Sequence, residues 1–187
     1  MKNTSRTLIV FGLLIFTAAL YRIVPGRPFG FDPMIAMAIF GGAVVTDKRW
    51  AFAVPLAAML LSDALYEALT RAHIVNMPGF YDGQWLNYIL IAGISFFGIL
   101  MKRVSVTNVA IAAVSAPLVY FILSNTGVWA FGGGYARPFT AAGWLQALAD
   151  GLPFLKYSLL GSVAFSAVLF GAWALITKSK AAQPRIA

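Results

Sequence analysis

Residues 51–67 read AFAVPLAAMLLSDALYE, and this stretch decides the fold of the chain. An apolar run interrupted by Pro55 is followed by two carboxylates, Asp63 and Glu67, four residues apart. On a helix, residues with this spacing project from the same face. Because an aspartate that faces lipid costs about 3 kcal/mol, we expect Asp63 to face other helices or a water-filled cavity. An acidic side chain in that environment is a candidate for function.

The overall composition is that of a membrane protein. Of the 187 residues, 60% are hydrophobic and 11% are charged, and the mean hydropathy is +0.81. A soluble domain of this length could not bury so much apolar surface, whereas a bilayer removes the need to bury it. The composition therefore predicts an all-α integral membrane protein with a single transmembrane domain, residues 1–187.

The basic residues indicate topology rather than a nucleic-acid partner. The chain has 14 Lys and Arg against 6 Asp and Glu, a net charge of +8, but these charges occur in pairs between apolar runs. A nucleic-acid-binding protein would gather them on one face, whereas a membrane protein uses them to hold loops on the cytoplasmic side. The absence of cysteine excludes disulfides and thiolate metal sites.

Apolar runs predict six helices that cross the lipid bilayer, at about residues 7–24, 33–46, 50–69, 85–101, 106–130 and 155–177. The second run is too short to span the hydrocarbon core when upright, so we expect it to be tilted or partly re-entrant. Residues 131–154 form the longest connection, an outer loop in which residues 139–152 could lie as a helix on the membrane surface.

The basic residues orient these spans. With the N-terminus in the cytoplasm, five basic residues lie outside and nine inside, the nine being Lys2, Arg6, Lys48, Arg49, Lys102, Arg103, Lys178, Lys180 and Arg185. This asymmetry predicts that both termini are cytoplasmic, in a multi-pass protein of a bacterial inner membrane. The long loops then lie outside, and we expect binding on the external face.

Counting residues along each span places several polar and aromatic side chains at one outer depth. They are Asp63, Tyr66, Glu67, Asn125, Trp129, Tyr157 and Lys156. The loops at residues 30–33 and 132–134 would cover them. Aromatic walls with a few converging polar groups are typical of a small-ligand site.

Each of these residues also has a simpler interpretation. Asp63 could pair with Arg22, Arg27 or Lys156 to fasten helices together, or it could couple to protons. Glu67 could be solvated, and Trp129 could be an interface residue. Asn125 could hydrogen-bond between helices.

The sequence indicates no enzyme, cofactor or metal site. No serine, histidine and acid fall at a common depth, as hydrolysis would need. The single histidine, His73, lacks companion ligands for a metal. The triple glycine at residues 132–134 is not a phosphate loop, because no strand precedes it and no Gly-Lys-Ser or Gly-Lys-Thr follows.

Several motifs resemble those of an uncharacterised family of bacterial six-helix membrane proteins: Phe31-x-Pro33-x-x-Ala36-x-Ala38-x-Phe40-Gly41-Gly42-Ala43, Pro55-Leu56, Ser62-Asp63, Asn125-x-Gly127-Val128-Trp129 and Leu152-Pro153-Phe154. The chain also resembles, more distantly, the S components of energy-coupling-factor vitamin transporters. The resemblance lies in the order of its elements: an irregular segment, a short helix rich in small residues, a charged turn, and an acidic residue late in the third helix. That resemblance implies an S-component-like bundle with an outward pocket, capture of a vitamin-like solute, and energy from separate transmembrane and ATPase subunits.

The sequence thus leads to the hypothesis of a membrane-embedded protein that binds and takes up a small, vitamin-like solute. Asp63 and Asn125 would orient the polar groups of this solute, with Glu67 nearby. Tyr66, Trp129 and Tyr157 would pack its apolar body, and the loop with Phe31 and Asp32 would close over it. The alternatives are a structural or assembly protein of the membrane and a solitary proton-coupled transporter.

Overall fold

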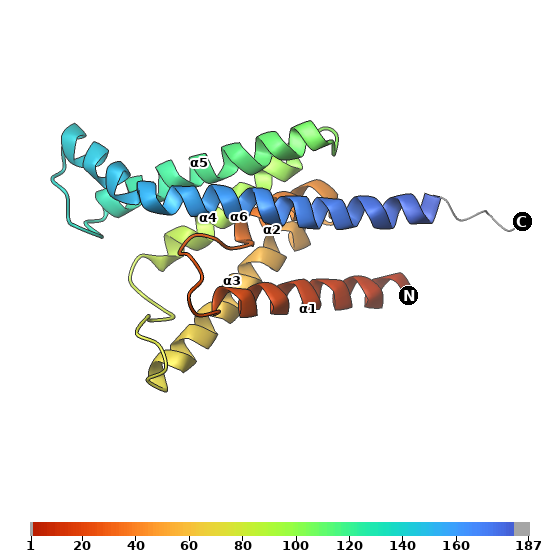
Figure 1. Ribbon diagram of the computed structural model, residues 1–187, viewed down its shortest axis with the longest axis horizontal. Coiled ribbons are helices and arrows are strands. Elements are labelled where there is room, and N and C mark those ends of the chain that lie inside the picture. The colour runs from red at the N-terminus through yellow and green to blue at the C-terminus, as the bar shows by residue number, and fades with distance from the viewer. Residues whose placement is uncertain (1, 182–187) are drawn as a thin grey trace, which may run out of the picture.

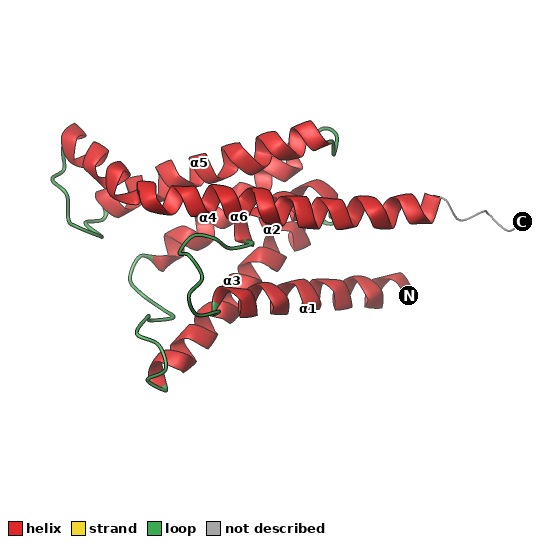
Figure 2. Ribbon diagram, viewed as in Figure 1, coloured by secondary structure: helices red, strands yellow, loops and turns green. Residues whose placement is uncertain are grey.

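The computed structural model describes residues 2–181, with side chains from residue 9 to residue 178. Within this part of the chain the protein folds into six helices (Figures 1 and 2), which are α1 (Lys2–Arg22), α2 (Met34–Val44), α3 (Lys48–Arg71), α4 (Gln84–Ile99), α5 (Val106–Ala130) and α6 (Ala141–Ala181). Three of the described helices, α3, α5 and α6, are long and apolar enough to cross a membrane, whereas α1, α2 and α4 contain shorter apolar segments.

The short helix α2 lies at the centre of the bundle. It packs against α3, α4, α5 and α6, and every residue from Met34 to Gly42 except Phe40 is buried. A helix that is apolar on all sides is typical of a protein core or of a membrane span, and here the other helices surround it. The second helix, expected at about residues 33–46, is short as predicted and has 11 residues.

Small residues let α2 and α4 approach so closely that their backbones touch. A Cβ atom at Gly42 would collide with the carbonyl oxygen of Ser95, and one at Gly98 would collide with the carbonyl oxygen of Ile39. Nearby, the hydroxyl of Ser95 donates to the carbonyl of Ala51 on α3 (3.2 Å). Glycine at helix crossings permits this separation because it has no side chain.

The two ends of the bundle differ. Figure 1 shows the start of α1, the end of α6 and the two short turns at one end, which we call the turn end. At this end Lys48 donates from Nζ to the carbonyls of Gly42 and Val45 (both 2.8 Å) and closes the C-terminus of α2. The three longer connections, residues 23–33, 72–83 and 131–140, lie at the opposite end, the loop end.

The connection before the last helix is shorter than expected. Residues 131–154 do not form one loop with a separate surface helix; α6 begins at Ala141 and continues through Pro153 as a single helix of 41 residues. Proline removes one backbone hydrogen bond and bends a helix without necessarily ending it. Figure 1 shows the first turns of α6 inclined to the remainder.

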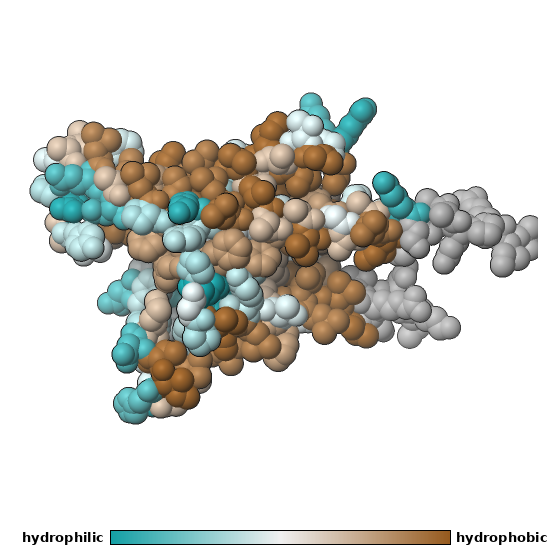
Figure 3. Space-filling view, in the orientation of Figure 1, coloured by the Kyte–Doolittle hydropathy of each residue, from teal (hydrophilic) through white to brown (hydrophobic). Residues whose placement is uncertain are grey.

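The surface of the bundle carries an apolar belt. Figure 3 shows hydrophobic side chains over the middle of α5 and α6, with polar side chains gathered at the loop end. On α5 alone Ile111, Val114, Ile122 and Leu123 are exposed. Such a belt on long apolar helices is consistent with a membrane protein.

The crossing of α2 and α4 provides a test of this packing. Gly98→Ala should lower the free energy of unfolding by about 1–3 kcal/mol, because overpacking forces the two backbones apart. Gly93→Ala on the same helix is the matched control, since no atom lies within 4 Å of its added Cβ. Thermal unfolding in detergent micelles measures both variants, and equal stability of the two would contradict the close crossing.

Candidate functional site

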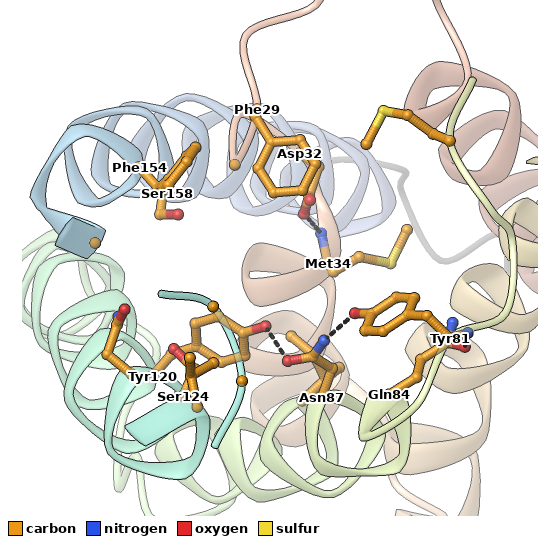
Figure 4. A pocket seen from close by; sticks show the side chains of 18 of the residues that line it. Phe29, Asp32, Met34, Tyr81, Gln84, Asn87, Tyr120, Ser124, Phe154 and Ser158 are labelled. Atoms are coloured by element: carbon orange, nitrogen blue, oxygen red, sulfur yellow. Dashed lines mark hydrogen bonds between the residues drawn. The ribbon is translucent and has the colours of Figure 1, made fainter. Parts of the chain in front are cut away.

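A cavity of about 430 Å³ opens among the helices at the loop end of the bundle. All six helices and all three long connections contribute to its wall. Met34 and Ile35, at the start of α2, lie at the wall with Asp63 of α3 and Asn87 of α4. Figure 4 shows aromatic and polar side chains from these elements around the central space.

Asp63 is buried in this wall and has three polar partners. The side chain is 5% exposed. One oxygen, Oδ1, accepts from Arg22 Nη1 (3.1 Å), and the other, Oδ2, accepts from Gln84 Nε2 (2.6 Å) and from the hydroxyl of Tyr88 (2.6 Å). A buried carboxylate is stable only when it is paired and hydrogen-bonded in this way. Of the three cations that the sequence offered as partners, Arg22 is the one that forms the ion pair.

The C-terminus of α1 is tied to the same wall. Arg22 Nη1 also contacts the hydroxyl of Ser62, which in turn donates to the carbonyl of Met59 (2.8 Å). The carbonyl of Arg22 accepts from the hydroxyl of Tyr66 (2.6 Å) and from Arg27 Nε and Nη2 (3.3 and 3.2 Å). These contacts hold α1 against α3 at the depth of Asp63.

A second polar network continues along α4. The hydroxyl of Tyr120 donates to Asn87 Oδ1 (3.0 Å), and Asn87 Nδ2 donates to the hydroxyl oxygen of Tyr81 (2.6 Å), as Figure 4 shows. Gln84 Oε1 accepts from the backbone N–H of Tyr81 (3.3 Å) and links this network to Asp63. Partial burial raises the pKa of the Tyr81 phenol, and Tyr81 also lines the cavity.

The opposite part of the wall comes from α5, α6 and the connection between them. Arg137 forms a two-point ion pair with Asp150, with Nε and Nη2 each 2.9 Å from a carboxylate oxygen. The indole N–H of Trp129 donates to the carbonyl of Pro138 (2.9 Å), and its ring stacks on Phe139. Asn125 Nδ2 donates to the carbonyl of Phe121 on its own helix (2.8 Å).

Five of the predicted ligand-binding residues line the cavity, namely Asp32, Asp63, Tyr66, Asn125 and Trp129. The predicted covering loops also contribute, through Gly30, Gly133 and Gly134. The role of these residues in binding stays a prediction.

Phe31, Glu67, Tyr157 and Lys156 are not part of the lining. Glu67 Oε1 accepts from Arg71 Nε (2.9 Å) and Oε2 accepts from the backbone N–H of Gly79 (3.3 Å). Phe31 packs against Tyr21 and Phe165. The ammonium group of Lys156 lies 5.5 Å from the centre of the Tyr157 ring.

The polar face of α4 was missed by the sequence analysis. Gln84, Asn87, Tyr88 and Ile91 follow the i, i+3, i+4, i+7 spacing of one helix face. The first three are polar, and Ser95 is the one other polar residue of α4. That pattern could have identified α4 as a wall of the site. The described residues contain no group of three or more histidine, aspartate or glutamate side chains placed to hold a metal ion.

The chain belongs to a family of unknown function (DUF6580), whose match covers residues 2–184. The expectation of membership in an uncharacterised family is confirmed to this extent. No curated protein and no solved structure matches the chain. The family assigns no activity, so we infer function from the geometry of the cavity.

The ion pair between Asp63 and Arg22 should contribute strongly to the free energy of unfolding. Asp63→Ala leaves Arg22 as a buried cation without its partner, which typically costs about 3–5 kcal/mol. The free energy of unfolding should therefore fall markedly, whereas Glu67→Ala, which removes a carboxylate one helical turn away and paired to the exposed Arg71, should have a much smaller effect. Denaturant unfolding in detergent measures both, and a similar loss in the two variants would contradict this assignment.

Proposed function

We propose that this member of a family of unknown function binds a small solute in its cavity and serves in the uptake of that solute across a bacterial inner membrane. In this proposal all six helices cross the bilayer and both termini are cytoplasmic. The cationic residues at the turn end support this orientation; among the residues whose side chains the structure describes they are Lys48, Arg49, Lys102, Arg103 and Lys178. The cavity at the loop end then opens to the extracytoplasmic side.

The observation that carries the proposal is the cavity itself. Its volume of about 430 Å³ falls within the range of small-molecule sites, which are apolar pockets with a few oriented polar groups. Phe29, Tyr81, Tyr120 and Phe154 supply aromatic surface around the space that Figure 4 shows. A bundle whose only role was structural would gain stability by filling such a space with side chains.

Uptake would require an energy source outside this chain. The sequence has no ATP-binding motif, so ATP-driven transport would depend on separate transmembrane and ATPase subunits. The resemblance to S components of vitamin transporters supports that arrangement and a vitamin-like ligand.

One observation favours the alternative of a structural or assembly protein of the membrane. Both oxygens of Asp63 are already hydrogen-bonded by Arg22, Gln84 and Tyr88, so this carboxylate fastens helices together in the structure described. Asp63 therefore serves to position the wall, and the solute would use other groups of the cavity.

The proposed topology can be tested by cysteine labelling, because the natural chain contains no cysteine. A membrane-impermeant maleimide should label Ala72→Cys at the loop end of intact spheroplasts. Arg103→Cys, at the turn end, should react only after the membrane is permeabilised. The reverse pattern would place the cavity on the cytoplasmic side.

Solute binding can be tested by filling the cavity. Ser124 lines it, whereas its neighbour Leu123 is exposed on the apolar surface of α5. Mass spectrometry of small molecules released from detergent-extracted protein should find the same compound in wild type and Leu123→Phe, with at least a tenfold loss in Ser124→Phe, because the phenyl ring occupies the binding space.

A folded Ser124→Phe variant that retains the compound would contradict binding at this cavity. The absence of any released compound from wild type would favour the structural alternative. Size-exclusion chromatography of the three proteins controls for loss of folding.

A further inference from the structure

The wall of the cavity contains an arginine whose hydrogen-bond donors are only partly used. Among the described residues, Nη1 donates every hydrogen bond of the Arg22 guanidinium. The acceptors are Asp63 Oδ1, the hydroxyl of Ser62 and the carbonyl of Met59. The Nε atom is buried and has no partner. The side chain as a whole is 18% exposed and borders the cavity.

The unused donors lie along one edge of the guanidinium group. Nε and Nη2 each direct an N–H from this edge, in the planar fork that matches two oxygens of a carboxylate or phosphate. A buried N–H without an acceptor is unfavourable. Because Nε has no accessible surface in this structure and Arg22 borders the cavity, a small movement of its side chain would have to bring this edge to a ligand oxygen. We propose that the cavity binds a small aromatic oxyanion whose carboxylate or phosphate oxygens accept hydrogen bonds from Arg22 Nε and Nη2. This inference rests on the proposed function.

The other charges of the cavity are compatible with an anion. Asp63 balances Arg22, and Asp150 balances Arg137. Arg27 also lines the cavity, and in the described part of the chain its hydrogen bonds go to backbone carbonyls of Arg22, Pro28 and Phe31 rather than to a carboxylate. Its positive charge is therefore available to a bound anion.

Asp32 is the carboxylate that could oppose this preference. Its Oδ1 accepts from the backbone N–H of Met34 (3.0 Å) in the first turn of α2, as Figure 4 shows. The N-terminus of a helix carries partial positive charge, so α2 offsets part of the negative charge of Asp32.

The aromatic part of the inference comes from the remaining lining. Phe29 and Phe154 form an edge-to-face pair with ring centres 5.5 Å apart, and both border the space in Figure 4. Tyr81 and Tyr120 lie across the cavity from them. Flat rings pack well against such surfaces in offset or edge-to-face arrangements.

The test compares acids with their neutral amides on the purified full-length protein. The probes are benzoate, 4-aminobenzoate, indole-3-acetate and phenyl phosphate, with benzamide, 4-aminobenzamide and indole-3-acetamide as neutral counterparts. Thermal shift and equilibrium dialysis at pH 7 give the Kd of each probe in phosphatidylcholine nanodiscs. At least one acid should bind about tenfold or more tightly than its amide, because hydrogen bonds to an ionised group are the stronger ones.

Three variants test whether Arg22 is responsible for the preference for acids over amides. Arg22→Lys keeps a cation for Asp63 but removes the side edge of the guanidinium, and it should abolish the preference for acids. Arg71→Lys, the same substitution outside the cavity, should leave the preference unchanged. Asp32→Asn retains an oxygen for the N–H of Met34 but removes a negative charge, so it should tighten acid binding several-fold. This variant provides an independent test if Arg22→Lys fails to fold.

The outcomes separate this inference from the proposed function. Equal affinity for acids and amides, or failure of every probe to bind, would overturn the aromatic oxyanion. Neither result would decide solute binding itself, which the Ser124→Phe experiment tests separately. Loss of acid binding when phosphatidylglycerol is added to the nanodiscs would assign the Arg22 edge to a lipid phosphate. That result would overturn its assignment to a solute.

Discussion

The structure depends on satisfying one buried carboxylate. Asp63 lies on α3 with its side chain removed from solvent, and a charge in that position needs donors from neighbouring elements. Arg22 arrives from the end of α1, and Gln84 and Tyr88 arrive from the start of α4. Because these three helices are held at the same depth, one wall of the cavity has a defined shape before any ligand binds.

The space itself follows from the length of α2. This central helix has 11 residues, or about 16 Å, whereas α3 and α5 have 24 and 25. Glycines let α4 pack directly on α2, so the bundle is dense along that helix. Beyond Met34, where α2 begins, the surrounding helices continue without a central partner, and the three long connections extend the cavity wall.

The sequence predicted the helices better than the site. Residues 106–130 were expected as one helix and form α5 with the same bounds, since a long apolar run leaves little choice. The last helix was expected at about residues 155–177, yet α6 begins at Ala141 and contains Pro153, because proline is compatible with a helix that can bend. Glu67 has the spacing that puts it on the face of Asp63, yet Arg71 and the backbone of Gly79 bind it outside the cavity. Such tertiary contacts cannot be read from spacing alone.

The loop end of the bundle holds a cavity bordered by Asp63 and Arg22, and we propose that this cavity is open to a ligand. An experimental structure of the protein, extracted with its native lipids and without added ligand, tests this most directly. We expect a space bordered by Arg22, Asn87 and Ser124, with density of a compact solute against the Nε and Nη2 edge of Arg22. Side chains closing that space, or acyl chains entering it from between the helices, would contradict the account.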